Sequence, residues 1–185
     1  MIKFHKVSWE QYEKDCIELV QKIEKLPKAE KPTKIVAICR GGLVAARILS
    51  DLLSIPISNI TIASYKNLKQ EKEPLIDETP SASFNNEVVL LVDEICDTGK
   101  TFKRALSYFN NFPLKKIYTL ALYTKSHANP QPDFFAKKID AWIIFPYELR
   151  ETKAAFMKMY KSEKETNEKL LKVGFKTHEV KAILS

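Results

Sequence analysis

The chain has 185 residues, 45% of them hydrophobic and 29% charged, which is the balance of one globular domain and excludes a disordered or fibrous protein. The net charge is +7, but lysines and carboxylates are mixed along the chain without a dense basic block, so a nucleic-acid partner is not expected. A basic balance also suits an enzyme whose substrates are polyanions. No apolar leader and no long apolar span is present, so we expect a cytoplasmic protein that does not enter a membrane.

The first part of the chain predicts a helix, a buried strand and a second helix. Apolar residues recur at helical spacing over residues 8–26, with Ser8 at the N-cap position and Pro27 after the helix. Residues 34–39 are mostly apolar and consecutive, which is typical of a strand buried on both faces. A second helical pattern covers residues 43–53. The sequence therefore indicates a strand followed directly by a helix.

Residues 59–64 predict another strand, and a long irregular connection follows it. Between residues 66 and 87, charges are mixed with Pro74, Pro80 and small polar residues, and no period is visible. Such a long connection within a compact domain indicates a functional lid or disorder. A hairpin that extends the sheet is an alternative for the same residues, and the two interpretations are compatible.

The second half of the chain again alternates strands and helices. Strands are predicted over 117–123 and 139–145, with a loop over 126–138 between them. From Arg150 onward the pattern is helical, with Gly174 as a helix stop. This order predicts an α/β fold with a twisted, mainly parallel sheet flanked by helices, followed by a helical tail.

The stretch with the most chemistry follows the apolar run over 88–92. Asp93 and Glu94 stand where that strand should end, and a short loop of small polar residues leads into the next helix. Loop amides and a helix N-terminus attract an anion, and carboxylates suit Mg²⁺ or sugar hydroxyls. The stretch therefore predicts a site for a phosphate and a cation.

Two other interpretations of this stretch are weaker. Gly99, Lys100 and Thr101 look like the end of a nucleotide P-loop, but that motif needs a glycine five residues before Gly99, where Glu94 stands. A buried strand with an acidic cap is the second alternative. Stability alone does not call for three carboxylates as close together as Asp93, Glu94 and Asp97.

The stretch Val88–Thr101 resembles the phosphoribosyl-pyrophosphate motif of the type I phosphoribosyltransferases. That motif has four apolar residues, two acidic residues, two apolar or small residues and then Asp/Thr-Thr-Gly-x-Thr, and every position is met. The resemblance covers about Ser8 to Glu148. It implies the type I phosphoribosyltransferase fold, whose ligands bind at the carboxyl ends of the strands.

The resemblance also implies how the chain is divided. Residues 1–150 would form the phosphoribosyltransferase domain, with a small hood from the N-terminal segment and about 137–150. A flexible loop would cover about 66–87. Residues 151–185 would be a helical C-terminal extension of the same domain, for which the resembled bacterial enzymes have no obvious counterpart.

Two further stretches resemble purine phosphoribosyltransferases of the bacterial xanthine–guanine type. Arg40 and Gly41 stand where these enzymes bind pyrophosphate: an arginine matches phosphate oxygens, and a glycine lets the backbone approach closely. A plain turn is the alternative. Ser64 and Tyr65 stand where the family's flexible loop begins, which closes over the reacting sugar and shields it from water.

The resemblance places a base site near the end of the domain. Lys125 corresponds to a lysine that donates to the exocyclic oxygen of the purine, and Trp142 with Ile143 to a pair that stacks on the base. The alternatives are a solvated strand end for Lys125 and core packing for Trp142. Ile144 departs from the pattern, because the xanthine–guanine enzymes carry an acidic residue there, so the preferred purine stays open.

The remaining roles are also implied by the resemblance. The 5-phosphoribosyl group would be bound by seven residues: Asp93, Glu94, Asp97, Thr98, Gly99, Lys100 and Thr101. Asp93 and Glu94 would also hold Mg²⁺, directly or through ribose hydroxyls or water. Asp97 is the candidate catalytic residue, because a carboxylate there could accept a proton from purine N7. Its alternative role is to form the loop with its own side-chain hydrogen bonds.

The function implied is a purine-salvage transferase. It would move the 5-phosphoribosyl group from phosphoribosyl pyrophosphate to guanine, xanthine or hypoxanthine, with Mg²⁺, as a homodimer or homotetramer. One alternative is a phosphoribosyltransferase for a pyrimidine base. The other is a regulatory protein that senses nucleotides on the same fold.

Overall fold

The computed structural model describes residues 2–66 and 69–182, and it describes no side chain of residues 64–73. The chain forms two compact units. The smaller consists of Met1–Tyr12 and Ala141–Ser185, and the larger of Glu13–Asp140.

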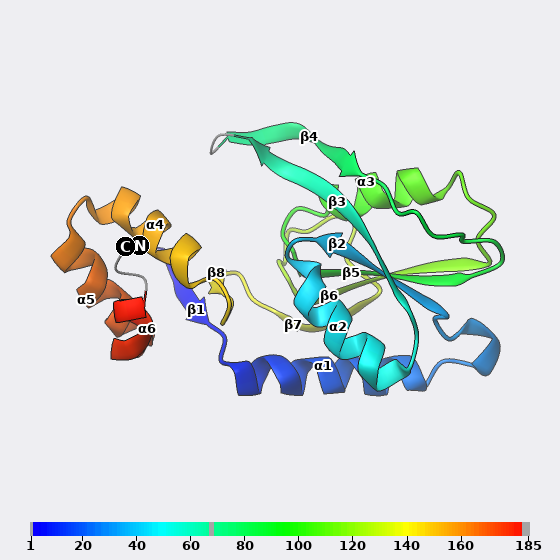
Figure 1. The fold of residues 1–185 in the computed structure, drawn as a ribbon, viewed down its shortest axis with the longest axis horizontal. Helices are drawn as coiled ribbons and strands as arrows, with labels where there is room; N and C mark the ends of the chain where they lie inside the picture. Colours follow the sequence, from blue (N-terminus) through cyan, green and yellow to red (C-terminus); the bar gives the residue numbers. More distant parts are fainter. Residues whose placement is uncertain (1, 67–68, 183–185) are drawn as a thin grey trace. The chain divides into compact units, whose positions relative to one another are not determined.

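The larger unit is built on a six-stranded sheet with the strand order β4-β3-β2-β5-β6-β7 (Figure 1). Its strands are β2 (Lys34–Cys39), β3 (Ile57–Lys66), β4 (Lys69–Glu78), β5 (Val88–Cys96), β6 (Lys116–Thr124) and β7 (Phe134–Lys138). All neighbouring strands run parallel except β3 and β4, which are antiparallel. The mainly parallel sheet predicted from the sequence is confirmed.

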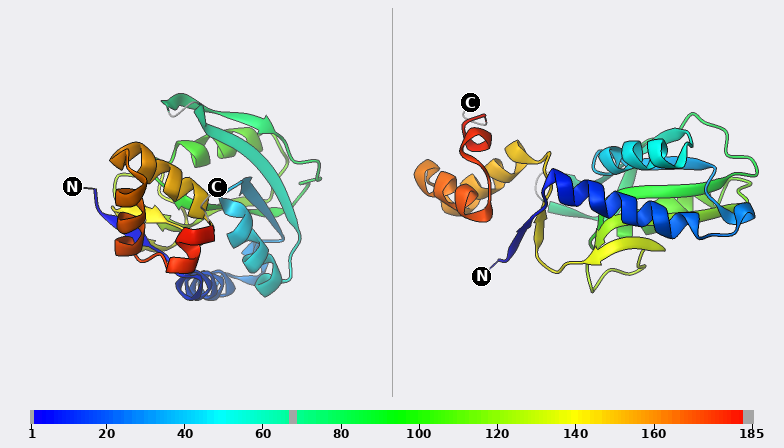
Figure 2. Two further views of the ribbon diagram at one scale, coloured as in Figure 1. Left: turned by 60° about the vertical axis from the view of Figure 1, so that its left-hand side comes forward. Right: turned by 90° about the horizontal axis from the view of Figure 1, so that it is seen from below.

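Three α-helices accompany this sheet: α1 (Trp9–Glu24), α2 (Gly42–Leu53) and α3 (Lys100–Phe109). A short 3-10 helix, η1 (Lys28–Glu30), follows α1. The Gln11 backbone N donates to Ser8 Oγ at 3.1 Å, which confirms Ser8 as the N-cap. Figure 2 shows α2 lying along the sheet, where it contacts β2 and β5.

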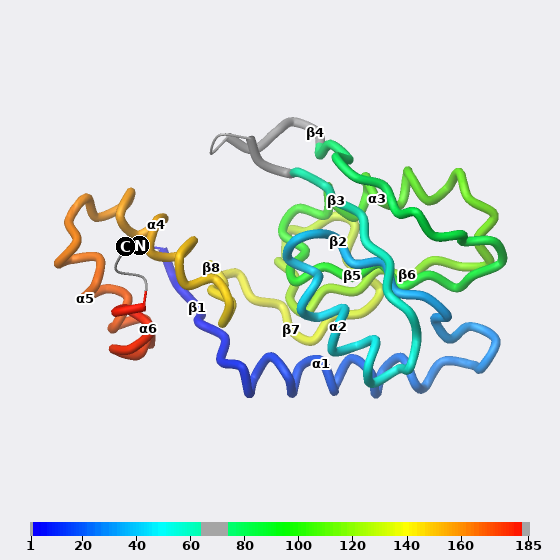
Figure 3. The backbone as a smooth tube through the Cα atoms, viewed as in Figure 1, coloured from blue at the N-terminus to red at the C-terminus, as the bar shows by residue number. Residues whose placement is uncertain are grey.

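One face of the sheet forms an apolar core with α3. The buried members of this core include Val36, Ile38, Ile60, Val89, Leu91, Phe102, Ala105 and Phe109. Full burial of a side chain of this size contributes about 1.5–3 kcal/mol, so this face ties α3 to the central strands. In Figure 3 the chain can be followed from β5 through α3 to β6. Because β5 and α3 are both part of this packed layer, the short loop between them is held at both ends.

A buried carboxylate ties α1 to β6 and β7. Asp15 is 1% exposed. Tyr123 Oη donates to Asp15 Oδ2 at 2.6 Å, and Lys137 Nζ lies 2.7 Å from Asp15 Oδ1. A buried charge with two such partners is satisfied, so Asp15 fixes the strand that leads to Lys125.

Two strands of this sheet lie in segments that were predicted mainly as connections. The segment over residues 66–87 contains β4, which pairs with β3 as in the hairpin given as the alternative, and the segment predicted as a loop contains β7. β4 is a charged edge strand that carries Pro74, and edge strands need no apolar period. The other edge strand, β7, is short and follows two prolines. The backbone of Ser64 and Tyr65 belongs to β3, and their side chains lie outside the described residues.

The smaller unit joins both ends of the chain. β1 (Phe4–Lys6) pairs in parallel with β8 (Trp142–Ile144), and three helices follow: α4 (Leu149–Tyr160), α5 (Glu163–Val173) and α6 (Thr177–Ala182). Its apolar core contains Ile144, Phe156, Leu170, Phe175 and Val180. Gly174 ends α5 with φ at 109°, as predicted. No helix among the described residues of either unit is long and apolar enough to cross a membrane.

Candidate active site

The candidate site lies in the larger unit, where three parallel neighbours, β2, β5 and β6, end at one edge of the sheet. β2 leads into Arg40 and Gly41, and β6 is followed by Lys125. β5 carries Asp93 and Glu94 close to its carboxyl end. Because these strands are hydrogen-bonded neighbours, residues far apart in the sequence come to the same edge. The structure therefore brings together the predicted phosphoribosyl residues, the predicted pyrophosphate residues and Lys125.

The acidic pair at the end of β5 is largely buried. Asp93 is 9% exposed, and its Oδ1 accepts a hydrogen bond from the Glu94 backbone N at 2.9 Å. Burial, and then the charge of Glu94, raise the pKa of Asp93 well above its usual range. Among the described residues, Glu94 Oε2 is buried without a hydrogen-bond partner. Two acceptors held this way fit a cation or sugar hydroxyls.

The same pair could hold a metal ion only together with other ligands. No group of three or more His, Cys, Asp or Glu side chains that could hold a metal occurs in the part of the chain that the structure describes. Mg²⁺ commonly keeps several waters and takes only one or two protein carboxylates together with substrate phosphates. Asp93 and Glu94 fit that pattern, although they could not enclose an ion by themselves.

The loop after β2 depends on two glycines for different reasons. A Cβ on Gly41 would lie 1.6 Å from Glu94 Oε2, so the Glu94 carboxylate occupies the space of that missing side chain. A Cβ on Gly42 would lie 2.2 Å from the backbone O of Val92. The peptide bond between Cys39 and Arg40, where β2 ends and this loop begins, is cis.

This difference gives a testable pair of variants. Gly41→Ala should displace only the end of the flexible Glu94 side chain, so we expect a loss of activity of about tenfold or more with little change in the midpoint of thermal unfolding. Gly42→Ala must move backbone of β5, so we expect a loss of stability of about 1–3 kcal/mol. Calorimetry and a pyrophosphate-release assay measure both. Equal stability losses in the two variants would contradict the assigned packing.

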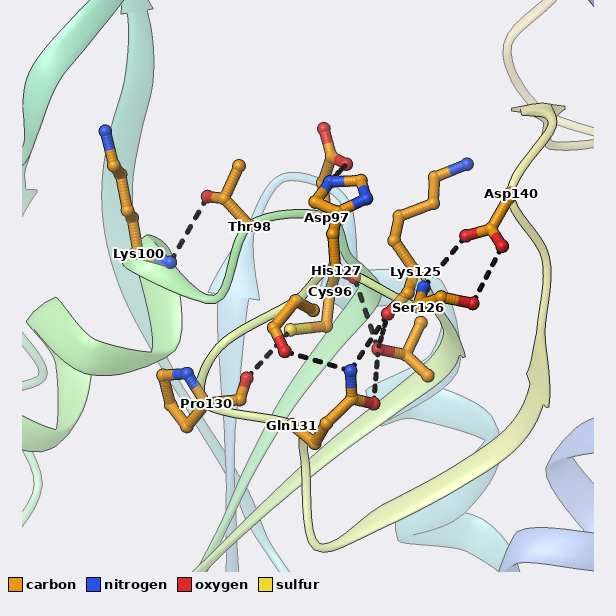
Figure 4. Close-up of polar contacts among 12 residues, drawn as sticks. Cys96, Asp97, Thr98, Lys100, Lys125, Ser126, His127, Pro130, Gln131 and Asp140 are labelled. Atoms are coloured by element: carbon orange, nitrogen blue, oxygen red, sulfur yellow. Dashed lines mark hydrogen bonds and ion pairs between the residues drawn. The ribbon is translucent and has the colours of Figure 1, made fainter.

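The loop between β5 and α3 turns at a glycine with a positive φ. Gly99 is the N-cap of α3 and has φ at 86°, a conformation that favours glycine. A Cβ there would also lie 2.5 Å from the backbone of Asn129. The Lys100 backbone N lies 3.4 Å from Thr98 Oγ1 (Figure 4). A loop of this kind before a helix N-terminus suits a phosphate group.

Lys125 follows β6 and is 8% exposed. Burial lowers its pKa, against the opposing carboxylates of Asp97 and Asp140. The next residue is fixed by a carboxylate: the backbone N and Oγ of Ser126 donate to the two oxygens of Asp140, at 2.8 and 2.7 Å (Figure 4). Lys125 therefore lies between the end of β6 and Ser126, which Asp140 holds in place.

The other two predicted base contacts belong to the smaller unit. Trp142 is 51% exposed on β8, and Ile143 next to it is buried. Ile144, the residue that departs from the xanthine–guanine pattern, is fully buried in the core with Phe156 and Leu170. The structure thus explains why an apolar residue stands at position 144, and the base contacts of Trp142 and Ile143 stay predictions.

Sequence reasoning missed two residues at this edge. His127 Nε2 lies 3.2 Å from Asp97 Oδ1, and Asp140 holds Ser126 as described above. Both lie in segments predicted as loop or strand start, without a motif around them. The only available signal was that polar residues follow a strand end in a fold whose ligands bind there.

Comparisons with known proteins identify relatives of the chain. The family described as "Phosphoribosyl transferase domain" matches residues 8–152. A xanthine-guanine phosphoribosyltransferase from Idiomarina loihiensis is 32% identical over 146 residues, which are 77% of this chain and 86% of the relative. Another, from Cereibacter sphaeroides, is 29% identical and covers 79% of this chain and 87% of its own length.

Two solved structures are similar to the chain as well. The purine phosphoribosyltransferase from Pyrococcus horikoshii Ot3 has a TM-score of 0.69 and 28% identity, over 78% of this chain and 93% of its own. The xanthine-guanine-hypoxanthine phosphoribosyltransferase from Helicobacter pylori has a TM-score of 0.68 and 29% identity, over 82% and 99%. The sequence comparison and the structural comparison therefore both find phosphoribosyltransferases.

Proposed function

The chain belongs to the phosphoribosyl transferase domain family, and from that premise we propose that it transfers the 5-phosphoribosyl group of phosphoribosyl pyrophosphate to a 6-oxopurine base. The products are a nucleoside monophosphate and pyrophosphate, as in purine salvage. The observation that carries the proposal is the acidic pair before the loop at the start of α3: Asp93 is buried, and Oε2 of Glu94 is buried without a hydrogen-bond partner among the described residues. That arrangement offers acceptors for ribose hydroxyls beside donors for the 5-phosphate.

Two loops at the sheet edge hold the phosphate groups of the sugar substrate. The loop Asp97–Thr101 binds the 5-phosphate through its amides and the hydroxyls of Thr98 and Thr101. Arg40 and Gly41 bind the pyrophosphate. Positioning the sugar and the base in line removes a large part of the entropic barrier. A bound Mg²⁺ beside Asp93 and Glu94 would neutralise charge on the pyrophosphate.

The reaction breaks the bond between the anomeric carbon and a pyrophosphate oxygen and forms one to a purine nitrogen. Positive charge develops on the sugar ring, as in glycosyl transfer generally. The purine gives up one N–H proton, and Asp97 is the carboxylate proposed to accept it. Asp97 is about half exposed, and it stands at the loop that binds the sugar phosphate.

The names of the relatives favour a purine over a pyrimidine, and Lys125 supports a 6-oxo group. Its ammonium can donate to the exocyclic oxygen, and partial burial strengthens that interaction. Trp142 and Ile143 are proposed to contact the base on the strength of the resemblance. A homodimer or homotetramer is proposed on the same ground, and sedimentation of the purified chain tests it.

The proposal is tested by pyrophosphate release from phosphoribosyl pyrophosphate and Mg²⁺, with guanine, xanthine, hypoxanthine, adenine and orotate offered in parallel. We expect release with at least one 6-oxopurine and none with orotate. Release with orotate alone would make the chain a pyrimidine enzyme. No release with any base, together with retardation of a nucleic acid in a mobility-shift assay, would favour the regulatory alternative.

A further inference from the structure

Gln131 lies in the loop between β6 and β7, and its amide turns back onto the residues at the end of β6. Its Nε2 donates to Lys125 O and to Ala128 O, both at 2.9 Å (Figure 4). Its Oε1 accepts a hydrogen bond from Thr124 Oγ1 at 3.1 Å, and Thr124 is fully buried at the end of β6. Both N–H donors and the carbonyl oxygen of this amide thus have partners.

These partners leave one orientation for the amide of Gln131. Its N–H groups face two carbonyl oxygens, which can only accept, and its oxygen faces a hydroxyl, which can donate. The reversed amide would set an oxygen against two carbonyl oxygens and would lose both of those hydrogen bonds. A polar network that is satisfied in this way, on a buried hydroxyl, specifies one arrangement of the loop.

The backbone of Lys125 is fixed on both sides of its Cα. Its N donates to Cys96 O at 3.0 Å, at the end of β5. Its O accepts from Gln131 Nε2 and, at 3.2 Å, from the Ala128 backbone N. Because the two peptide planes that flank a Cα set the direction of the Cα–Cβ bond, these hydrogen bonds aim the side chain of Lys125. Lys125 is 8% exposed, so packing restricts its stem further.

Accurate placement matters for a base contact at Lys125. A hydrogen bond from an ammonium weakens steeply outside its normal distance, so a shift of about 1 Å in the Cα of Lys125 would remove most of it. The contact of the same loop with the proposed 5-phosphate loop is made by the backbone, from Asn129 N to Thr98 O at 3.0 Å. That bond survives replacement of the Gln131 side chain, so its loss should be felt mainly at the base.

We propose that Gln131 is a positioning residue for the base: its amide holds the backbone of Lys125 where the ammonium meets the 6-oxo group of the purine. Gln131 acts through Lys125 and makes no contact with either substrate, and no proton or group moves to it or from it. This inference rests on the function proposed above and adds a determinant of base affinity to the same site.

The test measures KM for the base and for phosphoribosyl pyrophosphate separately, in the wild type, in Gln131→Met and in Thr124→Val. The base is whichever of guanine, xanthine and hypoxanthine the wild type turns over fastest. Methionine is also unbranched but donates no hydrogen bond, so KM for the base should rise about tenfold, as for a lost hydrogen bond to a charged group. KM for phosphoribosyl pyrophosphate should change by less than about twofold. Thr124→Val removes only the hydroxyl that donates to the amide, so the rise should be smaller, about two- to fourfold.

A double-mutant cycle shows whether Gln131 acts through Lys125. Lys125→Met should raise KM for the base at least as much as Gln131→Met does, and adding Gln131→Met to it should raise KM no further. The matched control is Asn111→Ala, which removes another amide that donates to two backbone oxygens, those of Ser107 and Tyr108 near the end of α3. Both KM values of this control should equal those of the wild type.

Several results would overturn the inference while the proposed function stood. They are an unchanged KM for the base in Gln131→Met and Thr124→Val, equal increases in both KM values, and an effect of Gln131→Met that persists undiminished in Lys125→Met. An unchanged KM for the base in Lys125→Met would overturn it as well, because there would be no contact to position. Absence of pyrophosphate release by the wild type with every base would overturn the proposed function first.

Discussion

Asp97→Asn is expected to lower kcat by about 10²–10⁴-fold, the range that a positioned acid or base contributes. The amide has nearly the same shape but cannot accept the purine proton. Because the side chain is about half exposed and its contact is an exposed one with His127, stability should change by less than about 0.5 kcal/mol. Binding of the sugar phosphate should persist, since the loop amides and Thr98 remain.

The measurement is steady-state pyrophosphate release, together with calorimetric titration of a 6-oxopurine nucleoside monophosphate. The control is Asp51→Asn, which removes an exposed carboxylate paired with Arg47 on α2. Control and wild type should have the same kcat. A turnover of Asp97→Asn equal to that of the wild type would remove Asp97 as the proton acceptor and would leave it as a former of the loop.

Ile144→Glu is expected to destabilise the smaller unit by about 3–5 kcal/mol, as for a buried charge without a partner. Ile144 is fully buried, and its core neighbours Phe156, Leu170 and Phe175 offer no hydrogen bond. Ile144→Val, which removes one methylene and no apolar character, should cost only about 0.5–1.5 kcal/mol. The comparison separates charge burial from a loss of packing.

The penalty should also depend on pH. Burial would raise the pKa of the introduced carboxyl in the folded state above its unfolded value of about 4.3. Below that value both states are protonated, so the penalty is smallest there, and it grows as pH rises towards the folded pKa. Denaturant unfolding at about pH 5 and about pH 8, followed by circular dichroism, measures this. An Ile144→Glu variant as stable as Ile144→Val at both values would show that position 144 is not sealed in the core.

The central strand of the sheet and its functional end could be predicted together, because one stretch contains both the apolar strand pattern and the acidic loop motif. The apolar run of β5 required burial on both faces, and the acidic pair with the Gly99 loop marked its carboxyl end. β7 was missed, and β4 was foreseen only through the hairpin alternative, because edge strands need no apolar period. They extend the sheet at its two sides, and the strands that carry the acidic pair and Lys125 lie between them.

Parts of the site could not be predicted from the sequence for a different reason. The contact of His127 with Asp97 depends on backbone hydrogen bonds between two loops that are 30 residues apart in the chain. The role of Gly41 as the space for the Glu94 carboxylate likewise exists only after β2 and β5 have paired. Both contacts arise because distant strands become neighbours in the sheet. A local sequence pattern does not show which strands will be neighbours.

The most direct test is a crystal structure of the chain with a bound 6-oxopurine nucleoside monophosphate. We predict that its phosphate oxygens lie about 2.7–3.2 Å from backbone amides of the Asp97–Thr101 loop, with the ribose hydroxyls on the Asp93 and Glu94 carboxylates. A nucleotide bound at another place, with its phosphate away from that loop, would contradict the assignment.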